Sequence, residues 1–157
     1  MVIHKRHGVP SLVFRVANAR GGEIVEASIR ATALLTEETP AGHRMRRLHD
    51  LKLIRDVNPI LIMSWTVVHP IDSDSPLYGM SEADLHEHDV RFIMNVTGID
   101  GTFMQSVYHY RLYMADDVVF EHAFADVVVA QEDSRTRFTL DMTQFDRLVP
   151  IDAANES

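Results

Sequence analysis

The chain contains one long run in which apolar and polar residues alternate, from position 24 to position 35. Apolar side chains occupy the odd positions of this run: Val25, Ala27, Ile29, Ala31, Ala33 and Leu35. The even positions between them are polar: Glu26, Ser28, Arg30 and Thr32. Because successive side chains of a strand point to opposite faces, this run predicts a β-strand with one buried and one polar face. The polar face, with Glu26 near its start, looks either at bulk water or at something more particular.

Most of the remaining chain also reads as short strands, which turn residues separate about every ten positions. The other predicted strands cover 12–17, 51–54, 60–69, 90–97, 102–113, 118–120, 124–129 and 135–140. Residues 36–47 read as an exposed hairpin loop, Gly98 and Gly101 bracket a tight loop, and Ser81 caps one short helix over 82–86. The pattern indicates an immunoglobulin-like antiparallel β-sandwich. We expect one domain over residues 1–148 and a flexible C-terminal tail over 149–157.

Composition narrows the function classes. The formal net charge of −8 argues against nucleic-acid binding, which needs a basic surface, and is compatible with a protein that attracts cations. The absence of cysteine excludes disulfides and thiolate metal sites. The most continuous apolar stretch, 59–68, is about half of the roughly 20 residues that a membrane-spanning helix needs. We expect no signal peptide and a soluble chain.

Catalytic and metal chemistry find little support. Residues 84–89 bring Asp84, His86, His88 and Asp89 together, but they read as an exposed helix end, because zinc normally takes ligands from several elements. The chain has no G-x-S-x-G elbow, and no pair of carboxylates stands out by its spacing. Trp65 and the aromatic residues Phe92, Phe103, Tyr108 and Phe120 read as core, with a stacking platform as the alternative. We therefore expect no enzyme, no resident cofactor and no metal site.

Three blocks of the sequence have recognisable patterns. The first, R-x-x-N-x-R…E-A at residues 15–20 and 26–27, resembles the opening of the cytoplasmic C-terminal domain of prokaryotic inward-rectifier potassium channels. The second, residues 69–78, reads HPIDSDSPLY and is similar to the family signature H-x-I-D-x-x-S-P-L-Y. The third, residues 117–124, reads DVVFEHAF and is similar to E-I-x-W-G-H-x-F. The order and spacing of the blocks agree with the family over about residues 1–145.

This resemblance implies a pore-extension and gating domain that forms a homotetramer around an axial vestibule. The transmembrane pore domain of the same polypeptide, with its T-x-G-Y-G filter, is missing from this chain. The resemblance places the domain at the cytoplasmic face of the bacterial inner membrane, with K⁺ as the permeant ion and Mg²⁺ or polyamines as blockers. Four copies of a chain with charge −8 carry four times that charge, −32, which favours cations in the vestibule.

The resemblance also assigns roles to single residues. Glu26 and Thr97 would line the ion pathway, and Arg20 would face anionic lipid headgroups. Because Thr97 stands where strong rectifiers carry a second acidic residue, we expect weak rectification at most. An apical gate loop would contain Gly98, Ile99, Asp100, Gly101 and Met104. The alternative is a free-standing immunoglobulin-like module that binds a small molecule or a protein.

Overall fold

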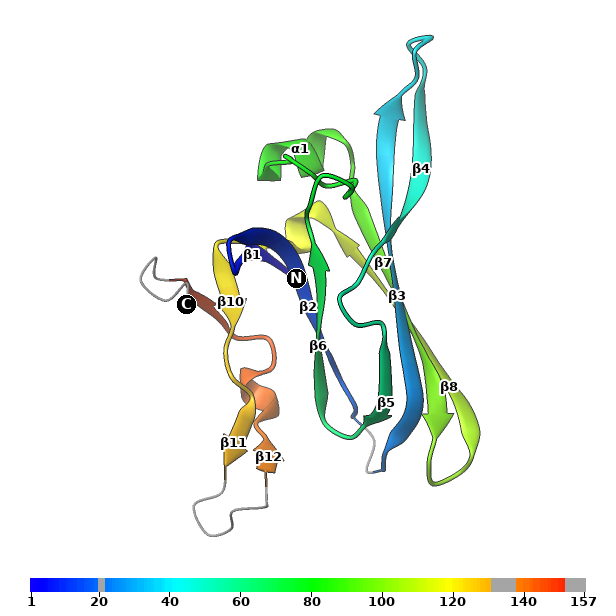
Figure 1. The fold of residues 1–157 in the computed structure, drawn as a ribbon, viewed down its shortest axis with the longest axis vertical. Helices are drawn as coiled ribbons and strands as arrows, with labels where there is room; N and C mark the ends of the chain where they lie inside the picture. The colour runs from blue at the N-terminus through cyan, green and yellow to red at the C-terminus, as the bar shows by residue number, and fades with distance from the viewer. Residues whose placement is uncertain (20–21, 131–137, 152–157) are drawn as a thin grey trace.

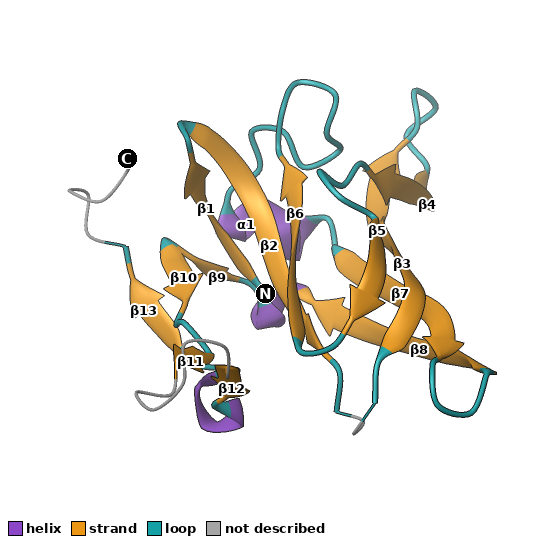
Figure 2. Cartoon of the chain, turned by 60° about the horizontal axis from the view of Figure 1, so that its bottom comes forward, coloured by secondary structure: helices purple, strands orange, loops and turns teal. Residues whose placement is uncertain are grey.

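Two β-sheets face each other across the main hydrophobic core (Figures 1 and 2). The structure is a computed structural model, and it describes residues 1–19, 22–130 and 138–151. The four-stranded sheet has the order β6-β2-β1-β9. Its strands are β1 (Val2–Arg6), β2 (Val9–Ala17), β6 (Ser64–Pro70) and β9 (Val119–Phe120). The five-stranded sheet has the order β4-β3-β7-β8, and β5 pairs with β3 as well. Its strands are β3 (Ile24–Glu38), β4 (Arg44–Leu51), β5 (Val57–Leu61), β7 (Arg91–Asp100) and β8 (Gln105–Met114). The predicted all-β sandwich is confirmed.

The alternating run forms β3, the central strand of the five-stranded sheet. Its odd positions from Ala27 to Leu35 are all buried, with at most 4% of each residue exposed. They pack against the apolar face of the four-stranded sheet, where Leu12 and Phe14 are also buried. The prediction is wrong at one position, because Val25 is only half-buried and Ile24 is buried in its place. A β-bulge between Val25 and Ser28 shifts the alternation there.

The C-terminal segment covers the other face of the four-stranded sheet (Figure 1). In this segment β10 (His122–Phe124) pairs with β13 (Leu148–Pro150). Between them, β11 (Val128–Ala130) pairs with β12 (Phe138–Leu140). The short 3-10 helix η2 (Met142–Gln144) follows β12. Phe124 and Leu148 pack against a second apolar cluster formed by Val2, Val13 and Val68. The predicted boundary at residue 148 falls inside β13, and residues 152–157 of the predicted tail lie outside the described residues.

The residues between 81 and 90 form the predicted helix, α1 (Glu82–Glu87). The Ser81 hydroxyl accepts from the Asp84 amide, and the Asp84 carboxylate accepts from the Ser81 amide, which is the expected reciprocal cap. A second short 3-10 helix, η1 (Ala115–Asp117), follows β8. Together α1 and η1 close one end of the sandwich near the β3–β4 hairpin (Figure 1).

The predicted exposed hairpin over residues 36–47 is present, but the prediction that most of it is a loop is wrong. β3 continues to Glu38 and β4 begins at Arg44, so a paired ribbon replaces most of the loop and projects beyond the sheet (Figure 1). Arg46 forms an ion pair with Asp89 just after α1, and the Arg44 guanidinium donates to the Glu87 carbonyl at 3.2 Å. These contacts tie the charged ribbon to the helix end. Charged residues on both strands hide this pairing in the sequence.

Two other predicted strands differ from the structure. The predicted strand 51–54 ends at once, because Leu51 is the last residue of β4. The predicted strand 60–69 divides into β5 and β6, since β5 pairs with β3 in one sheet and β6 pairs with β2 in the other. The chain crosses between the sheets at Ile62 and Met63, a change of partner that an apolar run does not reveal.

Candidate functional site

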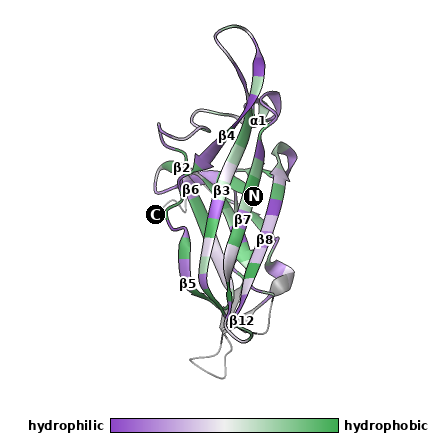
Figure 3. Ribbon diagram, turned by 90° about the vertical axis from the view of Figure 1, so that its right-hand side faces the viewer, coloured by the Kyte–Doolittle hydropathy of each residue, from purple (hydrophilic) through white to green (hydrophobic). Residues whose placement is uncertain are grey.

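The outer face of the five-stranded sheet, which points away from the core, carries most of the predicted site residues. Figure 3 is turned toward this side of the molecule, where β3 and β7 lie between β5 and β8. Strand register places side chains on this face in rows that run across the sheet. One row joins Ser28 of β3 to Thr97 of β7 and Tyr108 of β8. The next row joins Arg30 to Asn95 and Tyr110.

The β3 and β7 members of these rows, Ser28, Arg30, Thr97 and Asn95, form a polar stripe along the middle of the outer face. The Ser28 and Thr97 hydroxyls lie 2.8 Å apart and share a hydrogen bond. The Tyr108 hydroxyl donates to the Asn95 side-chain oxygen at 3.0 Å. Thr97 is exposed, as its predicted role in the ion pathway requires. The stripe can therefore offer water or a hydrated ion several hydroxyl and amide groups.

The charges on this face differ in how they are balanced. The Arg30 guanidinium donates to both carboxylate oxygens of Asp50, at 3.2 and 2.6 Å, so these two charges offset each other. The hydrogen bond from Arg30 lowers the pKa of the Asp50 carboxyl. Glu26 is exposed and makes no ion pair with any of the residues that the structure describes. Its negative charge therefore remains available to a mobile cation.

The predicted gate loop has a different shape from the one expected. Thr97 to Asp100 belong to β7, and the turn that joins β7 to β8 covers residues 101–104. The Asp100 carboxylate is buried and accepts from the Thr102 and Phe103 amides at 2.9 and 3.0 Å. Asp100 therefore holds the turn together and does not point into open space. The bracketing of the loop by Gly98 and Gly101 is wrong, because Gly98 lies within a strand.

Exposed apolar side chains surround this turn and the end of the sheet beside it. Met104 is 75% exposed, and its neighbour Phe103 is 71% exposed. Ile99 pairs across the ladder with Val25, which itself pairs with Ile60 of β5. The sequence reading missed Phe103, which it assigned to the core. Its position two residues after Gly101, beside a predicted tight loop, was the available signal of exposure.

The other predicted core aromatics divide in the same way. Trp65 and Phe92 are buried, at 5% and 0% exposed, as predicted. Tyr108 is 67% exposed and Tyr110 is 60% exposed, because β8 is the edge strand of its sheet. Leu112 and Met114 continue this exposed row along β8. The row forms one apolar margin of the outer face.

The cluster over residues 84–89 does not converge on a common point. Asp84 caps α1, His86 lies 3.5 Å from Asp116, and Asp89 pairs with Arg91 at 3.0 Å. The His88 ring bonds through Nδ1 to the Thr36 carbonyl at 3.0 Å. Within the described part of the chain, no three His, Asp or Glu side chains are placed so that they could hold a metal ion.

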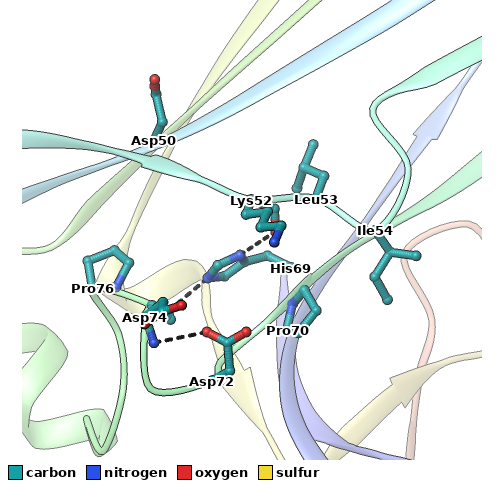
Figure 4. Close-up of a pocket in the computed structure, with 10 residues that line it drawn as sticks. Asp50, Lys52, Leu53, Ile54, His69, Pro70, Asp72, Asp74 and Pro76 are labelled. Atoms are coloured by element: carbon teal, nitrogen blue, oxygen red, sulfur yellow. Dashed lines mark hydrogen bonds between the residues drawn. The ribbon is translucent and has the colours of Figure 1, made fainter.

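The signature block surrounds a pocket of about 280 Å³ that lies between β4 and the turn after β6 (Figure 4). His69 is buried at its wall, where Nδ1 bonds to the Lys52 carbonyl at 2.7 Å and Nε2 bonds to the Ser75 hydroxyl at 2.8 Å. These contacts fit a neutral ring that donates from Nδ1 and accepts at Nε2. The Asp72 carboxylate accepts from the Asp74 amide at 3.0 Å, so Asp72 stabilises the turn after β6. The hydrogen bonds of His69 thus join β6 to the segment that follows β4.

The buried His69 predicts a stability that depends on pH. Burial lowers the pKa of its imidazole, which the Lys52 hydrogen bond only partly opposes. Above about pH 6.5 the His69 ring is neutral in both the folded and the unfolded chain. Below this pH the unfolded chain binds a proton that the folded ring does not bind. We expect stability to fall as the pH decreases below 6.5, by at most about 1.4 kcal/mol per pH unit for this group.

Urea unfolding of the wild type and of His69→Gln between pH 7.5 and 5.5 measures this contribution. The variant should start less stable and show a shallower fall. His109→Gln, which removes an exposed ring on β8, serves as the control and should keep the wild-type slope. Equal slopes for His69→Gln and the wild type would show that His69 does not cause the pH dependence.

The structure also describes most of the first sequence block, the opening at residues 15–20 and 26–27. Asn18 is buried and donates from Nδ2 to the carbonyls of Gly22 and Leu61, at 2.7 and 3.1 Å, so it fixes the turn before β3. Arg20, the predicted lipid contact, lies outside the described residues. None of the helices in the described part of the chain has the length and apolar composition that crossing a bilayer requires.

The chain is similar in sequence to known proteins over its whole length. The family model for the inward rectifier potassium channel C-terminal domain matches residues 1–157. The inward rectifier potassium channel Kirbac3.1 of Paramagnetospirillum magnetotacticum is 37% identical over 145 residues, which cover 92% of this chain and 48% of that protein. Human inward rectifier potassium channel 4 is 29% identical over 154 residues, which cover 96% of this chain and 34% of that protein.

A third relative is the ATP-sensitive inward rectifier potassium channel 11 of Cavia porcellus, which is 30% identical over 156 residues. Those residues cover 96% of this chain and 39% of that channel. The chain thus spans half or less of the length of these relatives. The match with the family model runs from end to end of the chain and includes all three sequence blocks. The chain belongs to the family of inward rectifier potassium channel C-terminal domains.

Proposed function

We propose that this chain is the cytoplasmic pore-extension and gating domain of an inwardly rectifying potassium channel. In the complete channel, the transmembrane pore domain of the same polypeptide precedes it, and four copies surround one axis. The domain lies at the cytoplasmic face of the bacterial inner membrane. Its role is to gather cations beneath the pore and to admit or exclude them at an apolar constriction.

The observation that supports this proposal best is the arrangement of the outer face. The polar stripe runs along its middle, and Glu26, which forms no ion pair among the described residues, lies at one end. Exposed apolar side chains lie on both margins. They are Tyr108, Tyr110 and Leu112 on β8, and Leu48, Val57 and Ile60 on β4 and β5. A subunit of a closed ring needs such a face, because its middle lines the water-filled axis and its margins contact two neighbours.

The chemistry of the stripe suits permeant cations. Four Glu26 carboxylates around one axis raise the local concentration of K⁺ and attract divalent or polyamine blockers more strongly. Thr97 contributes a hydroxyl without charge, so the second acidic ring of strong rectifiers is missing. We therefore expect block by Mg²⁺ or polyamines to be weak.

The turn over residues 101–104 is the part suited to a gate. Phe103 and Met104 project from it, and Ile99 lies beside it on β7. Four copies of these side chains would form an apolar girdle that closes the path by excluding water. Gly101 allows the turn to pack closely on Glu23, since a Cβ atom there would lie 2.8 Å from the Glu23 Cγ. Anionic lipid headgroups near Arg20 complete the proposal for the membrane side.

The test of the proposal is the substitution Glu26→Gln in the full-length channel. It removes four charges from the vestibule and preserves side-chain size, so the half-blocking concentration of internal Mg²⁺ or spermine should rise roughly threefold to tenfold. Current recordings from excised membrane patches give this concentration directly. Glu38→Gln, at the exposed end of the β3–β4 ribbon, is the control and should leave block unchanged. Unchanged block in Glu26→Gln would remove Glu26 from the ion pathway.

A further inference from the structure

The ladder between β3 and β7 loses its regular register at one point. Val25 pairs with Ile99 and Ser28 pairs with Thr97, so Glu26 and Ala27 together lie opposite Gly98 alone. On the other side of β3, the register with β5 stays regular through the same residues, from Val25 opposite Ile60 to Ser28 opposite Val57. The irregularity is therefore a β-bulge confined to the β7 side.

Glu26 is the residue that carries the bulge. Its φ is +50°, in the left-handed region that costs a residue with a Cβ atom roughly 1–2 kcal/mol. As a result Val25 and Glu26 are both turned away from the core, and Ile24 and Ala27 on either side are buried. A regular strand would alternate these positions, so the bulge decides where the Glu26 carboxylate points.

Gly98 supplies the space that this bulge needs. A Cβ atom on residue 98 would lie 2.5 Å from Ile24 Cγ2, 3.3 Å from the Val25 carbonyl oxygen and 3.4 Å from Ala27 Cα. Two of these three atoms belong to the backbone of the bulge itself. The φ of Gly98 is not in the left-handed range, so glycine is required here for its small volume. This differs from the sequence-based expectation, in which glycine bends a loop.

We infer that Gly98 is a positioning residue for Glu26: its missing side chain admits the bulge that aims the carboxylate at the vestibule. This inference rests on the proposed function of Glu26. A side chain at position 98 would press on the bulge, straighten β3 and turn the carboxylate. The gate turn would keep its own contacts, because Asp100 holds the Thr102 and Phe103 amides independently.

Thiol labelling measures the direction of residue 26 without relying on block. The chain contains no cysteine, so Glu26→Cys introduces its single thiol. In full-length channels without other cysteines, a cationic thiol reagent applied from the cytoplasmic side should modify this thiol at least about threefold more slowly when Gly98→Ala is also present. Glu38→Cys, at the exposed end of the β3–β4 ribbon, is the matched control and should react equally with either residue at position 98.

Block of the channel current by internal Mg²⁺ gives a second readout. Gly98→Ala should raise the half-blocking concentration of Mg²⁺ about as much as Glu26→Gln does, and the double variant should show no further rise. Adding Ile24→Ala removes the atom that lies 2.5 Å from the new Cβ. It should restore much of both the labelling rate and the block. This double variant also tests the positioning role of Gly98 if Gly98→Ala alone assembles poorly.

The outcomes separate the two proposals. Unchanged labelling and block in Gly98→Ala, with weaker block in Glu26→Gln, would overturn the positioning role and leave the proposed function standing. No change in block with Glu26→Gln would remove both. Slower labelling at position 26 but not at position 38, reversed by Ile24→Ala, would establish Gly98 as the positioning residue.

Discussion

Replacing Phe92 with alanine should lower the free energy of unfolding by about 3–5 kcal/mol, the largest effect of a single substitution that we expect. Phe92 is completely buried near the start of β7, where it pairs with Ala33 of β3 and Tyr113 of β8. Ala33 is too small to fill the space that a shortened side chain would leave. The loss therefore combines the burial of the ring with the cost of a cavity.

Chemical denaturation of the variant and two controls tests this prediction. Phe92→Leu keeps most of the volume and should cost much less than the alanine variant. Tyr108→Ala removes an aromatic ring of similar size from the exposed row and should stay within about 1 kcal/mol of the wild type. If Tyr108→Ala lowers the free energy of unfolding as much as Phe92→Ala does, then Tyr108 is buried in solution, as it would be at an interface between subunits.

Replacing Arg15 with alanine should release the C-terminal segment from the four-stranded sheet. The Arg15 guanidinium lies 4.8 Å from the centre of the Phe124 ring and 5.9 Å from that of Phe145. It also donates to the carbonyls of Ala125 and Phe145, at 2.8 and 3.5 Å. Burial lowers the pKa of Arg15 somewhat, but an arginine remains charged at any pH of interest. Losing a charged hydrogen-bond donor and its ring contacts should cost about 2 kcal/mol.

Hydrogen exchange locates this loss. The Ala125 amide, which bonds to the Arg147 carbonyl at 2.8 Å, should exchange about 30 times faster in Arg15→Ala, and the amides in the middle of β3 should change much less. Arg15→Lys keeps the charge but cannot donate in the same fork, so it should fall between the two. Equal acceleration throughout the chain would mean that the segment does not open separately.

The sequence allowed the sandwich to be predicted because its period-two pattern is long and its turns are well marked. The odd positions of β3 from Ala27 to Leu35 are all buried as predicted, and the capping box at Ser81 is present. The bulge at Glu26 was not predictable, because the extra residue of a bulge leaves no distinctive residue type in the sequence. It depends on Gly98, which lies 72 positions later in the chain and meets β3 only in the folded state.

The sequence suggested residues for the candidate site but not the shape of the backbone that carries them. The family resemblance identified Glu26, Thr97 and the segment to Met104, and the structure places most of them on one end of one sheet face. Asp100 could not be separated from a pathway acid by sequence, since a carboxylate that caps a turn and one that faces water look alike. Phe103 and Tyr108 were assigned to the core because aromatic side chains are usually buried, and only the edge position of β8 and the adjacent turn explain their exposure.

The parallel pairing of β1 with β9 has a consequence for biosynthesis. Val2 and Ile3 pair with Val119 and Phe120, so the four-stranded sheet cannot acquire its last strand until most of this domain has left the ribosome. The hairpin of β1 and β2, which needs no distant partner, can form early, but one of its edges waits for a strand made much later. A nascent chain stalled before residue 119 should therefore expose an unpaired strand edge, at which chaperones would be expected to act.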